Sequence, residues 1–344
     1  ASFAACGAEA AVAPLLRGKA VQRFSDFGTN PDLADVVRGI AAFKAFAPDL
    51  VLAVGGGSVI DLAKAVNILA FQAGEPAAHV AGAAKLVPAG LPLVAVPTTS
   101  GAGSEATHFA VVYLGKAKYS LAHPAMVPAA ALVDPVFTAG LPARIAACTG
   151  ADAFCQAMEA YWSVQAAETS KVWACQALQL LRDHLETAVR APTDEARAAT
   201  SRAAHLAGKA INVAKTTASH ALSYPFTAHF GVPHGHAVAL TLARVFVYNA
   251  GVQADDLADR RGLEYVRRTM AELASIFEAG SPWLAFEAIT GLFQRIGLEL
   301  DPVRLGVTPA DIDLILREAS VERMRNNPRR VTSAGARAIL QSLF

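Results

Sequence analysis

The sequence contains few charged residues and almost no net charge. Asp, Glu, Lys and Arg make up 17% of the 344 residues, whereas soluble proteins average about 25%. Thirty basic side chains against 29 acidic ones leave a formal charge of +1, so no global basic field is available for nucleic acid or an anionic membrane. Because 53% of the residues are hydrophobic, the chain has ample apolar surface to bury, which excludes disorder.

Long uninterrupted hydrophobic runs are absent as well. A membrane-spanning helix needs about 18 or more apolar residues without charge. Val51–Val54 runs into three glycines, Leu91–Val96 stops at a proline, and Ala237–Ala243 is broken by an arginine. We therefore assign the hydrophobic residues to buried strands and to closely packed, alanine-rich helices of a soluble protein with no membrane partner.

Cysteine is scarce too. The four cysteines are widely spaced and form no Cys-x-x-Cys pair; they are Cys6, Cys148, Cys155 and Cys175. In a chain of this size such spacing argues against a disulfide framework. A reducing compartment, the cytoplasm, is therefore the expected location.

Residues 1–140 alternate between strand and helix patterns. Leu50–Val54 and Leu93–Val96 are short apolar runs typical of buried parallel strands. Asp32–Phe46 has an amphipathic helical pattern, and Ser58–Phe71 is predicted to be a helix capped by its first serine. This alternation predicts a parallel α/β domain.

After Leu141 the strand signals fade, and residues 141–344 are predicted to form an all-helical domain. The predicted helices are Arg144–Trp162, Ser170–Arg190, Asp194–Ala214, Gly235–Val247, Gly262–Phe277, Pro282–Ile296, Pro309–Glu318 and Ser333–Leu343. At roughly 150 residues per domain, the length also suggests two domains.

Two loops that follow the predicted strands carry residues suited to a nucleotide. Residues 55–58 are Gly-Gly-Gly-Ser at the start of a helix, where glycines and free N–H groups favour a diphosphate. Residues 97–107 contain hydroxyls and glycines at the carboxyl end of the next strand, where open α/β sheets bind ligands. Asp61 and Lys64 follow the first loop and would orient a ribose or each other; without a ligand they are typical of a solvated i,i+3 ion pair.

The helical half contains a candidate metal centre. Asp152 and Gln156 are four residues apart and so share one helix face. Four of the nine histidines fall within seventeen residues, at 220, 229, 234 and 236. A carboxylate on one helix and histidines on others commonly build a metal site.

These motifs together resemble the iron-dependent (group III) alcohol dehydrogenase family. The matching segments are 55–64, 97–107, 134–142, 150–161, 220–235 and 327–329, in the family's order and approximate spacing. The resemblance implies a Rossmann-like dinucleotide-binding α/β domain followed by an all-helical metal and catalytic domain, an architecture shared with dehydroquinate synthase. Segments 24–31, 118–124, 208–242 and 324–330 are similar to the phosphonoacetaldehyde reductase branch, which forms 2-hydroxyethylphosphonate in phosphonate biosynthesis.

The resemblance implies that NADH or NADPH binds the two loops. The pyrophosphate would contact Gly56, Gly57 and Ser58, with Asp61 nearby. Thr98, Thr99 and Ser104 would contact the phosphate, ribose and nicotinamide side, and Lys118 the nicotinamide ribose.

The resemblance also implies a divalent metal, Fe²⁺ or Zn²⁺, that polarises an aldehyde oxygen. Asp152, His220 and His234 match three of the family's ligand positions. Gln156 occupies the fourth, where relatives carry histidine, and an amide oxygen is a weaker donor than imidazole. Tyr224 likewise replaces a histidine assigned to proton relay, so the relay is expected to involve His229, His236 or Tyr224.

A phosphonate aldehyde carries a charge near −2 and needs cations or hydrogen-bond donors beside the metal. The candidates are Asn212, Lys215, Arg325 and Arg329, of which Arg329 belongs to the general family motif. Relatives begin with a hairpin and a first Rossmann strand before the segment matching Ser2–Val12, so we expect this chain to be incomplete at its start. Homodimers are common among relatives.

Alternative functions stay open at this point. A group III dehydrogenase could act on another small, uncharged alcohol or aldehyde. Gln156 and Tyr224 support a different class, a metal-free binding protein or non-redox homologue. A metal-dependent lyase of the dehydroquinate synthase type shares the architecture, but its specific motifs are not seen here. Aldehyde-dependent oxidation of NADH or NADPH would discriminate among these functions.

Overall fold

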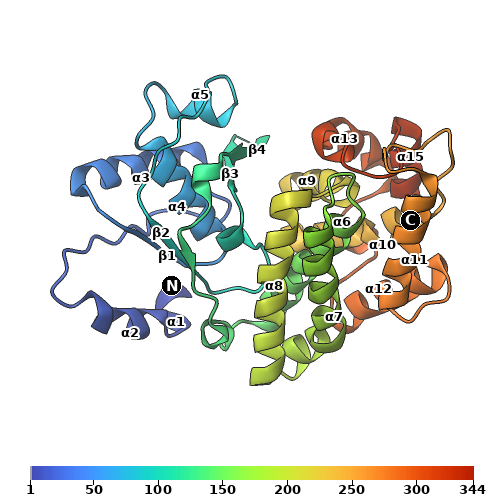
Figure 1. Ribbon diagram of the computed structural model, residues 1–344, viewed down its shortest axis with the longest axis horizontal. Coiled ribbons are helices and arrows are strands. Elements are labelled where there is room, and N and C mark those ends of the chain that lie inside the picture. The colour runs from blue at the N-terminus through green and yellow to red at the C-terminus, as the bar shows by residue number, and fades with distance from the viewer. Residues whose placement is uncertain (1, 116) are drawn as a thin grey trace. The chain divides into compact units, whose positions relative to one another are not determined.

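A computed structural model describes residues 2–115 and 117–344. The chain divides into two compact units, Ala1–Leu141 and Pro142–Phe344. The first contains every strand of the described residues, and the second is built from helices (Figure 1). This confirms the predicted fold class, an α/β domain followed by a helical domain. No helix among the described residues combines the length and apolarity needed to cross a membrane.

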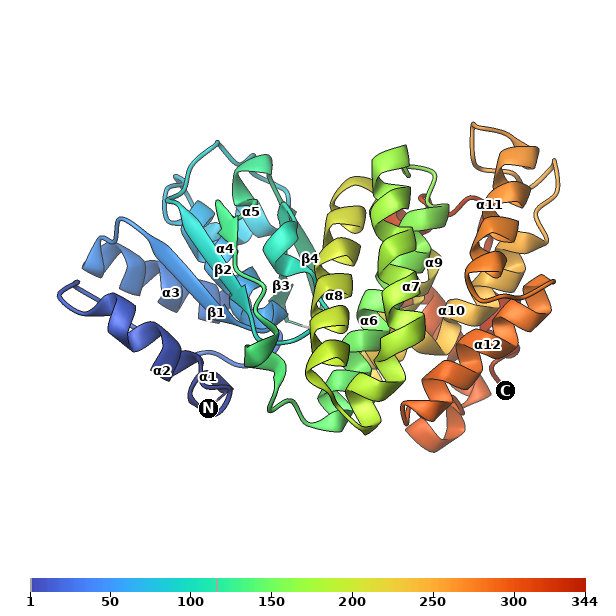
Figure 2. The ribbon, with the colours of Figure 1, turned by 60° about the horizontal axis from the view of Figure 1, so that its bottom comes forward.

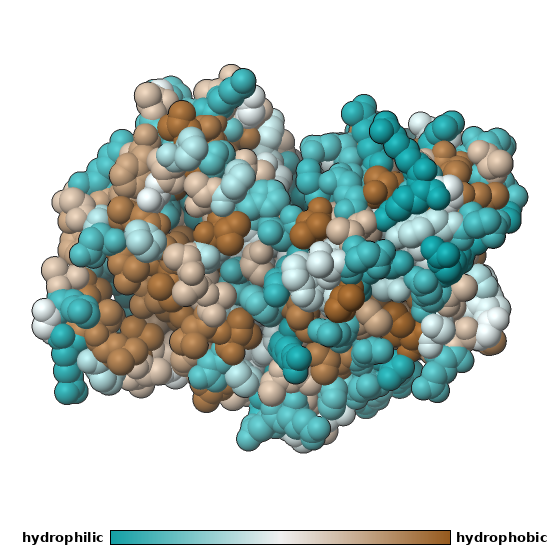
Figure 3. Space-filling view, viewed as in Figure 1, coloured by the Kyte–Doolittle hydropathy of each residue, from teal (hydrophilic) through white to brown (hydrophobic). Residues whose placement is uncertain are grey.

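The first unit is built on a parallel sheet of three strands. The order is β1 (Val51–Gly55), β2 (Leu93–Pro97) and β5 (Ala130–Ala131), with both neighbouring pairs parallel. The parallel strands are confirmed, but the prediction that the first is buried is wrong. β1 is an edge strand of this sheet, so Leu52 is 37% exposed. Figure 3 shows apolar residues gathered on the visible face of this unit.

Helices pack beside the sheet. α3 (Leu33–Phe46) begins at a capping box in which Asp32 and Asp35 each accept the other's backbone N–H. α4 (Gly57–Leu69) is capped by Gly56, so the predicted cap at Ser58 is wrong. The Ser58 hydroxyl instead accepts the N–H of Asn30 at 3.3 Å. Shorter helices are α1 (Ser2–Ala5), α2 (Ala8–Val12) and α5 (Pro76–Val80).

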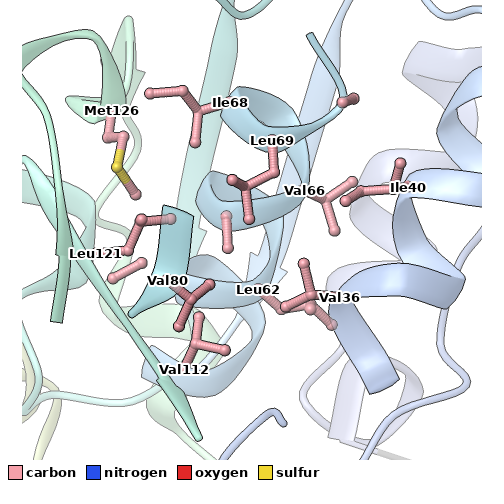
Figure 4. Packing of buried hydrophobic residues seen from close by; sticks show 13 residues of the cluster. Val36, Ile40, Leu62, Val66, Ile68, Leu69, Val80, Val112, Leu121 and Met126 are labelled. Atoms are coloured by element: carbon pink, nitrogen blue, oxygen red, sulfur yellow. The ribbon is translucent and has the colours of Figure 1, made fainter. Parts of the chain in front are cut away.

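An antiparallel hairpin, which the sequence pattern did not predict, covers the far side of α4. It joins β3 (Phe109–Leu114) to β4 (Ala117–Ala122), with Phe109 opposite Ala122. Figure 4 shows α4 between α3 and this hairpin, with side chains from all of them in one apolar cluster. Val36, Val66 and Val112 come from α3, α4 and β3 respectively. The hairpin was missed because its strands pair mainly with each other and lie outside the parallel sheet.

Asp61 and Lys64 of α4 are buried instead of forming a solvated ion pair. Asp61 is 9% exposed, and its Oδ2 accepts the N–H of Val111 at 2.9 Å. Lys64 is 1% exposed; its Nζ donates to the Ser104 carbonyl at 2.8 Å and to the Thr107 hydroxyl at 3.0 Å. Burial lowers the pKa of Lys64 to about 8, although Asp61 and Glu105 oppose the shift.

The second unit is a helical assembly (Figures 1 and 2). α6, α7 and α8 pack side by side, and α10 packs on α6 and α9. The helices are α6 (Ala143–Trp162), α7 (Glu168–Arg190), α8 (Asp194–Ala214), α9 (Ala218–Phe230), α10 (His234–Ala250), α11 (Leu263–Ile276), α12 (Pro282–Arg295), α13 (Ile312–Glu318), α14 (Val321–Met324) and α15 (Ser333–Gln341). The eight predicted helices are confirmed to within a few residues; α9, which contains Pro225, and α14 were not predicted as separate helices.

Lys64 should make stability rise with pH in a defined window. Its pKa is about 8 in the folded chain and about 10.5 when unfolded. Between these values the folded state releases a proton that the unfolded state keeps, so the cost of burying the charge disappears as pH rises. Relative to Lys64→Met, the wild type should gain about 2 kcal/mol of unfolding free energy between pH 7 and 10 in urea titrations.

Taking the difference in unfolding free energy between wild type and Lys64→Met cancels the contribution of tyrosines and other lysines that titrate in the same pH range. A stability difference between the two proteins that stays constant across this pH range would contradict a depressed pKa at Lys64.

Candidate functional site

The two predicted nucleotide loops lie against each other in the first unit. β1 and β2 end in register, with Gly55 opposite Pro97, and the Thr98 N–H donates to the Gly55 carbonyl at 3.0 Å. A Cβ added to Gly56 would meet the Thr99 side chain at 3.2 Å, and one at Gly57 would meet Cβ of Ala102 at 2.7 Å. Close packing of the two loops therefore requires glycine at both positions. α4 begins at this point, and the first N–H groups of a helix are available to a ligand.

The other predicted cofactor residues divide into two groups. Thr98 and Ser104 are buried in the second loop, and the Ser104 hydroxyl lies next to Gly57. Lys118 lies half-buried on β4, opposite Tyr113. Asp61, by contrast, faces the hairpin through Val111, and burial raises its pKa despite the opposing charge of Lys64. This geometry favours a structural role for Asp61 over contact with a ribose.

Three predicted metal ligands meet in the second unit. Asp152 of α6, His220 of α9 and His234 of α10 place one ligand atom each within 4.8 Å of the others. The Nε2 atoms of His220 and His234 lie 3.4 and 3.9 Å from Oδ1 of Asp152.

A glycine permits this convergence. A Cβ on Gly235 would lie 2.0 Å from the carbonyl oxygen of Cys148 and 2.8 Å from Cβ of Asp152. The first turn of α10 therefore touches the backbone of α6. This close approach brings His234 to the carboxylate of Asp152. Any larger residue at 235 would separate the two helices.

Glu159, which the sequence reasoning did not single out, holds His220 in place. It is fully buried, and its Oε1 accepts from the Thr217 hydroxyl at 2.8 Å and from the Ser219 N–H at 2.8 Å. Its Oε2 contacts Nδ1 of His220. Asp152, Gln156 and Glu159 are spaced i, i+4, i+7 on one helix face, and that spacing is the signal that could have revealed it.

The electrostatics of this pair keep Glu159 ionised. Burial alone would raise the pKa of Glu159, but His220 and the hydroxyl and N–H donors outweigh burial and hold it below its usual range. Burial likewise opposes the charged form of His220, yet the carboxylates of Glu159 and Asp152 raise its pKa. With Nδ1 engaged by Glu159, the Nε2 lone pair of a neutral ring faces the other two ligands.

The residues fit a divalent metal. Nε2 of His220 is buried and makes no hydrogen bond among the described residues, as expected for an atom meant to coordinate. Two imidazoles and one carboxylate match the donors that Fe²⁺ and Zn²⁺ accept. Gln156 lies beside them, and its Nε2 donates to Oδ2 of Asp152 at 3.2 Å. This bond steadies the carboxylate, and Gln156 stays a predicted fourth ligand through its amide oxygen.

The predicted relay residues differ in their surroundings. Nε2 of His229 contacts Glu318 at 2.5 Å, and Nε2 of His236 contacts the Glu299 carbonyl at 2.6 Å. The Tyr224 ring lies 6.1 Å from the ring of His234, between centroids. Among the contacts that the described residues make, Tyr224 is the one of the three whose ring reaches a ligand of the metal centre.

The predicted substrate residues are also dispersed. Lys215 is exposed just after α8, and Asn212 lies half-buried in the last turn of that helix. Arg325 is exposed after α14. Arg329 donates to Asp256 at 2.6 Å and to the Tyr248 carbonyl at 2.7 Å, an arrangement that favours a structural role.

Replacing Glu159 with glutamine should weaken metal binding while the chain stays folded. The amide retains the shape of the side chain but loses the charge that orients the His220 ring, and such supporting contacts are worth about 10- to 100-fold in metal affinity. Competition with a chelator measures the affinity for Zn²⁺. The exposed Glu168→Gln serves as the control, and equal affinities in the two variants would contradict the assigned role of Glu159.

Replacing Gly57 with alanine should disturb the nucleotide loops. The new Cβ would push against Ala102 and force the loops apart, so NADH and NADPH should bind about tenfold more weakly or worse, a loss of about 1.4 kcal/mol. Nucleotide fluorescence titration measures the effect. Gly280→Ala is the matched control because an added Cβ there meets nothing within 4 Å; similar losses in both variants would rule out the loops as the binding site.

Comparison with known proteins supports the same assignment. The family described as iron-containing alcohol dehydrogenase matches residues 2–135, and its C-terminal counterpart matches residues 146–344. A phosphonoacetaldehyde reductase of Streptomyces viridochromogenes is 39% identical over 323 residues, which cover 89% of this chain and 78% of that protein. Long-chain-alcohol dehydrogenase 1 of Geobacillus thermodenitrificans is 31% identical, covering 95% and 83% of the two chains.

Solved structures agree with these relatives. Sulfoacetaldehyde reductase from Bifidobacterium kashiwanohense, crystallised in complex with NAD⁺, superposes with a TM-score of 0.87 at 29% identity, covering 99% of this chain and 88% of that one. The resemblance stated from the sequence motifs is thereby confirmed. The chain belongs to the iron-containing alcohol dehydrogenase family and is an oxidoreductase of alcohols and aldehydes.

Proposed function

We propose that the protein reduces phosphonoacetaldehyde to 2-hydroxyethylphosphonate with NADH or NADPH and a divalent metal, as a step in phosphonate biosynthesis. The observation that carries the proposal is the convergence of Asp152, His220 and His234 in a chain that is 39% identical to a phosphonoacetaldehyde reductase over 89% of its length. A solved relative is named for sulfoacetaldehyde, which is also a two-carbon aldehyde that ends in an oxyanion.

The chain's residues have distinct tasks in this reaction. When bound, the metal supplies a Lewis acid for the aldehyde oxygen and the nicotinamide supplies a hydride. Asp152, His220 and His234 would hold the metal, and Glu159 fixes the ring that presents Nε2 of His220. Gly56 and Gly57 let the two loops pack together, and the diphosphate would bind at the start of α4 beside them. The protein thus positions the reacting groups and supplies charged side chains.

The product alcohol also needs a proton on its oxygen. Of the three relay candidates, Tyr224 has its ring against His234, whereas His229 and His236 are engaged by Glu318 and the Glu299 carbonyl. We therefore assign the proton delivery to the Tyr224 hydroxyl. A phenol O–H is a hydrogen-bond donor, which is what this role requires.

The cytoplasm is part of this proposal, because nicotinamide cofactors are used there and because the four cysteines are all free thiols. The principal rival is reduction of an uncharged aldehyde, which the 31% identity to a long-chain-alcohol dehydrogenase supports. The two functions differ in what lies beside the metal ligands: a cation for an anionic substrate or an apolar surface for an alkyl chain.

A panel of aldehydes tests the proposal directly. Purified protein loaded with Fe²⁺ or Zn²⁺ should oxidise NADH or NADPH with phosphonoacetaldehyde at a kcat/KM at least about tenfold above those for propanal and butanal, because only the first substrate adds charge-assisted hydrogen bonds. The absorbance of the reduced cofactor at each aldehyde concentration provides the rates.

Protein freed of metal with a chelator is the control in the same assay. Higher kcat/KM with butanal than with phosphonoacetaldehyde would favour the uncharged-substrate alternative. Absence of bound metal together with absence of activity on every aldehyde would favour the non-redox class.

A further inference from the structure

A proline in α9 fixes the position of the short helix α14. Pro225 has no N–H, so the carbonyl of Ala221, one turn earlier, receives no bond from within the helix. The N–H of Ser320 donates to that carbonyl at 3.2 Å. Because Ser320 caps α14, this bond places the first turn of α14 against the middle of α9, one turn from Tyr224.

Arg323 of α14 reaches the neighbourhood of the metal ligands. Its Cζ lies 5.5 Å from the centroid of the Tyr224 ring, and that ring in turn contacts His234. Its Nη1 donates to the Thr216 hydroxyl. The guanidinium is half-buried and, within residues 2–115 and 117–344, has no carboxylate partner.

Among the arginines nearby in the sequence, Arg329 is paired with Asp256 and Arg337 with Asp313, whereas Arg325 and Arg330 are exposed to solvent. Glu318, the acidic residue just before α14, is engaged by His229. Most arginines held inside a protein find an anion, so a half-buried guanidinium without one, close to a reaction centre, indicates that the anion comes from a ligand.

The turn that receives Arg323 is held in a strained conformation. Thr216 is 2% exposed, and its carbonyl accepts from the Asn326 side chain at 3.0 Å. The preceding residue, Lys215, has φ 59° and ψ 175°, a region that is otherwise almost restricted to glycine. Such strain persists at functional sites where surrounding contacts impose it, and the strained residue is itself an exposed lysine that precedes Thr216 in the chain.

We propose that Arg323, supported by Thr216 and flanked by Lys215, forms an oxyanion subsite beside the metal centre. The subsite would take the phosphonate end of a two-carbon aldehyde through the planar fork of the guanidinium, which matches tetrahedral oxyanions. The inference rests on the proposed function for its substrate. Phosphonate and sulfonate share this chemistry, and the dianionic phosphonate gains more than the monoanionic sulfonate from a fixed cation.

The first experiment measures anion binding without turnover. Ethylphosphonate and ethanesulfonate are titrated calorimetrically into metal-loaded protein saturated with NAD⁺. Wild type should bind ethylphosphonate more tightly than ethanesulfonate, and Arg323→Met should weaken ethylphosphonate binding by about tenfold or more. Arg323→Lys should give an intermediate value, because it keeps the charge and loses the fork. Arg317→Met, an exposed arginine of α13, is the matched control and should bind as wild type does.

The second experiment compares substrates. Arg323→Met should raise KM for phosphonoacetaldehyde by about tenfold or more and leave KM for propanal within about twofold, since propanal has no anion to lose. If Arg323→Met does not fold, Arg323→Lys carries the same comparison with a smaller expected change. Equal changes for both aldehydes, or ethylphosphonate affinity unaltered in the Arg323 variants, would overturn the subsite. A loss confined to Arg325→Met would overturn it as well.

The outcomes separate the subsite from the proposed function. Wild type that binds ethylphosphonate through Arg323 but does not reduce phosphonoacetaldehyde would contradict the substrate and support the subsite. Wild type that reduces phosphonoacetaldehyde with no dependence on Arg323 would support the function and refute the subsite. Failure to bind either anion would refute the subsite regardless of activity.

Discussion

One buried carboxylate, that of Glu159, organises the helical unit. Its oxygens accept hydrogen bonds from Thr217 and Ser219 and contact the ring of His220, and so hold the start of α9. The Thr217 hydroxyl in turn accepts from the indole N–H of Trp162 at 2.8 Å. A charge at such depth is costly unless it is neutralised and fully hydrogen-bonded. The structure satisfies that condition with an opposing imidazole and several donors, and the same bonds that stabilise Glu159 determine where Nε2 of His220 points.

The scarcity of charged residues follows from how closely the helices pack around this network. Gly150 leaves room for Leu185, and Gly235 brings α10 onto the backbone of α6. Long α6 is buried along most of its length, and alanine is the most frequent of its buried residues. Helices that approach each other at this distance can use only small, uncharged residues at the contact. The polar residues that remain inside, Asp152 and Glu159 among them, are therefore those that bind or orient something.

The sequence predicted the elements with local signals and missed those determined by tertiary contacts. Helices with clear periodicity, such as Asp194–Ala214, and the strands before glycine-rich loops were found because each pattern lies within one segment. The hairpin β3–β4 and the burial of Lys64 depend on which face α4 presents to which neighbour, and no local pattern contains that information. Arg323 was missed for the same reason, since its partner Thr216 lies 107 residues away. Glu159 was missed although its spacing from Asp152 and Gln156 places all three on one helix face. The metal ligands were predicted because family motifs specify the identity of residues. Such motifs contain no information about the hydrogen bonds that hold those residues in place.

Because of Pro225, two parts of the helical unit, the helices with the metal ligands and the segment with Arg323, can change in sequence independently. The metal ligands lie on long helices whose packing leaves little freedom to vary, whereas Arg323 lies on a segment attached to α9 through the carbonyl that the proline leaves open. Because that attachment is a bond between main-chain groups, the side chains of this segment can be exchanged without losing it. Divergence within the family can therefore proceed by replacing this one short stretch, so that new substrates are acquired while the inherited redox chemistry is retained.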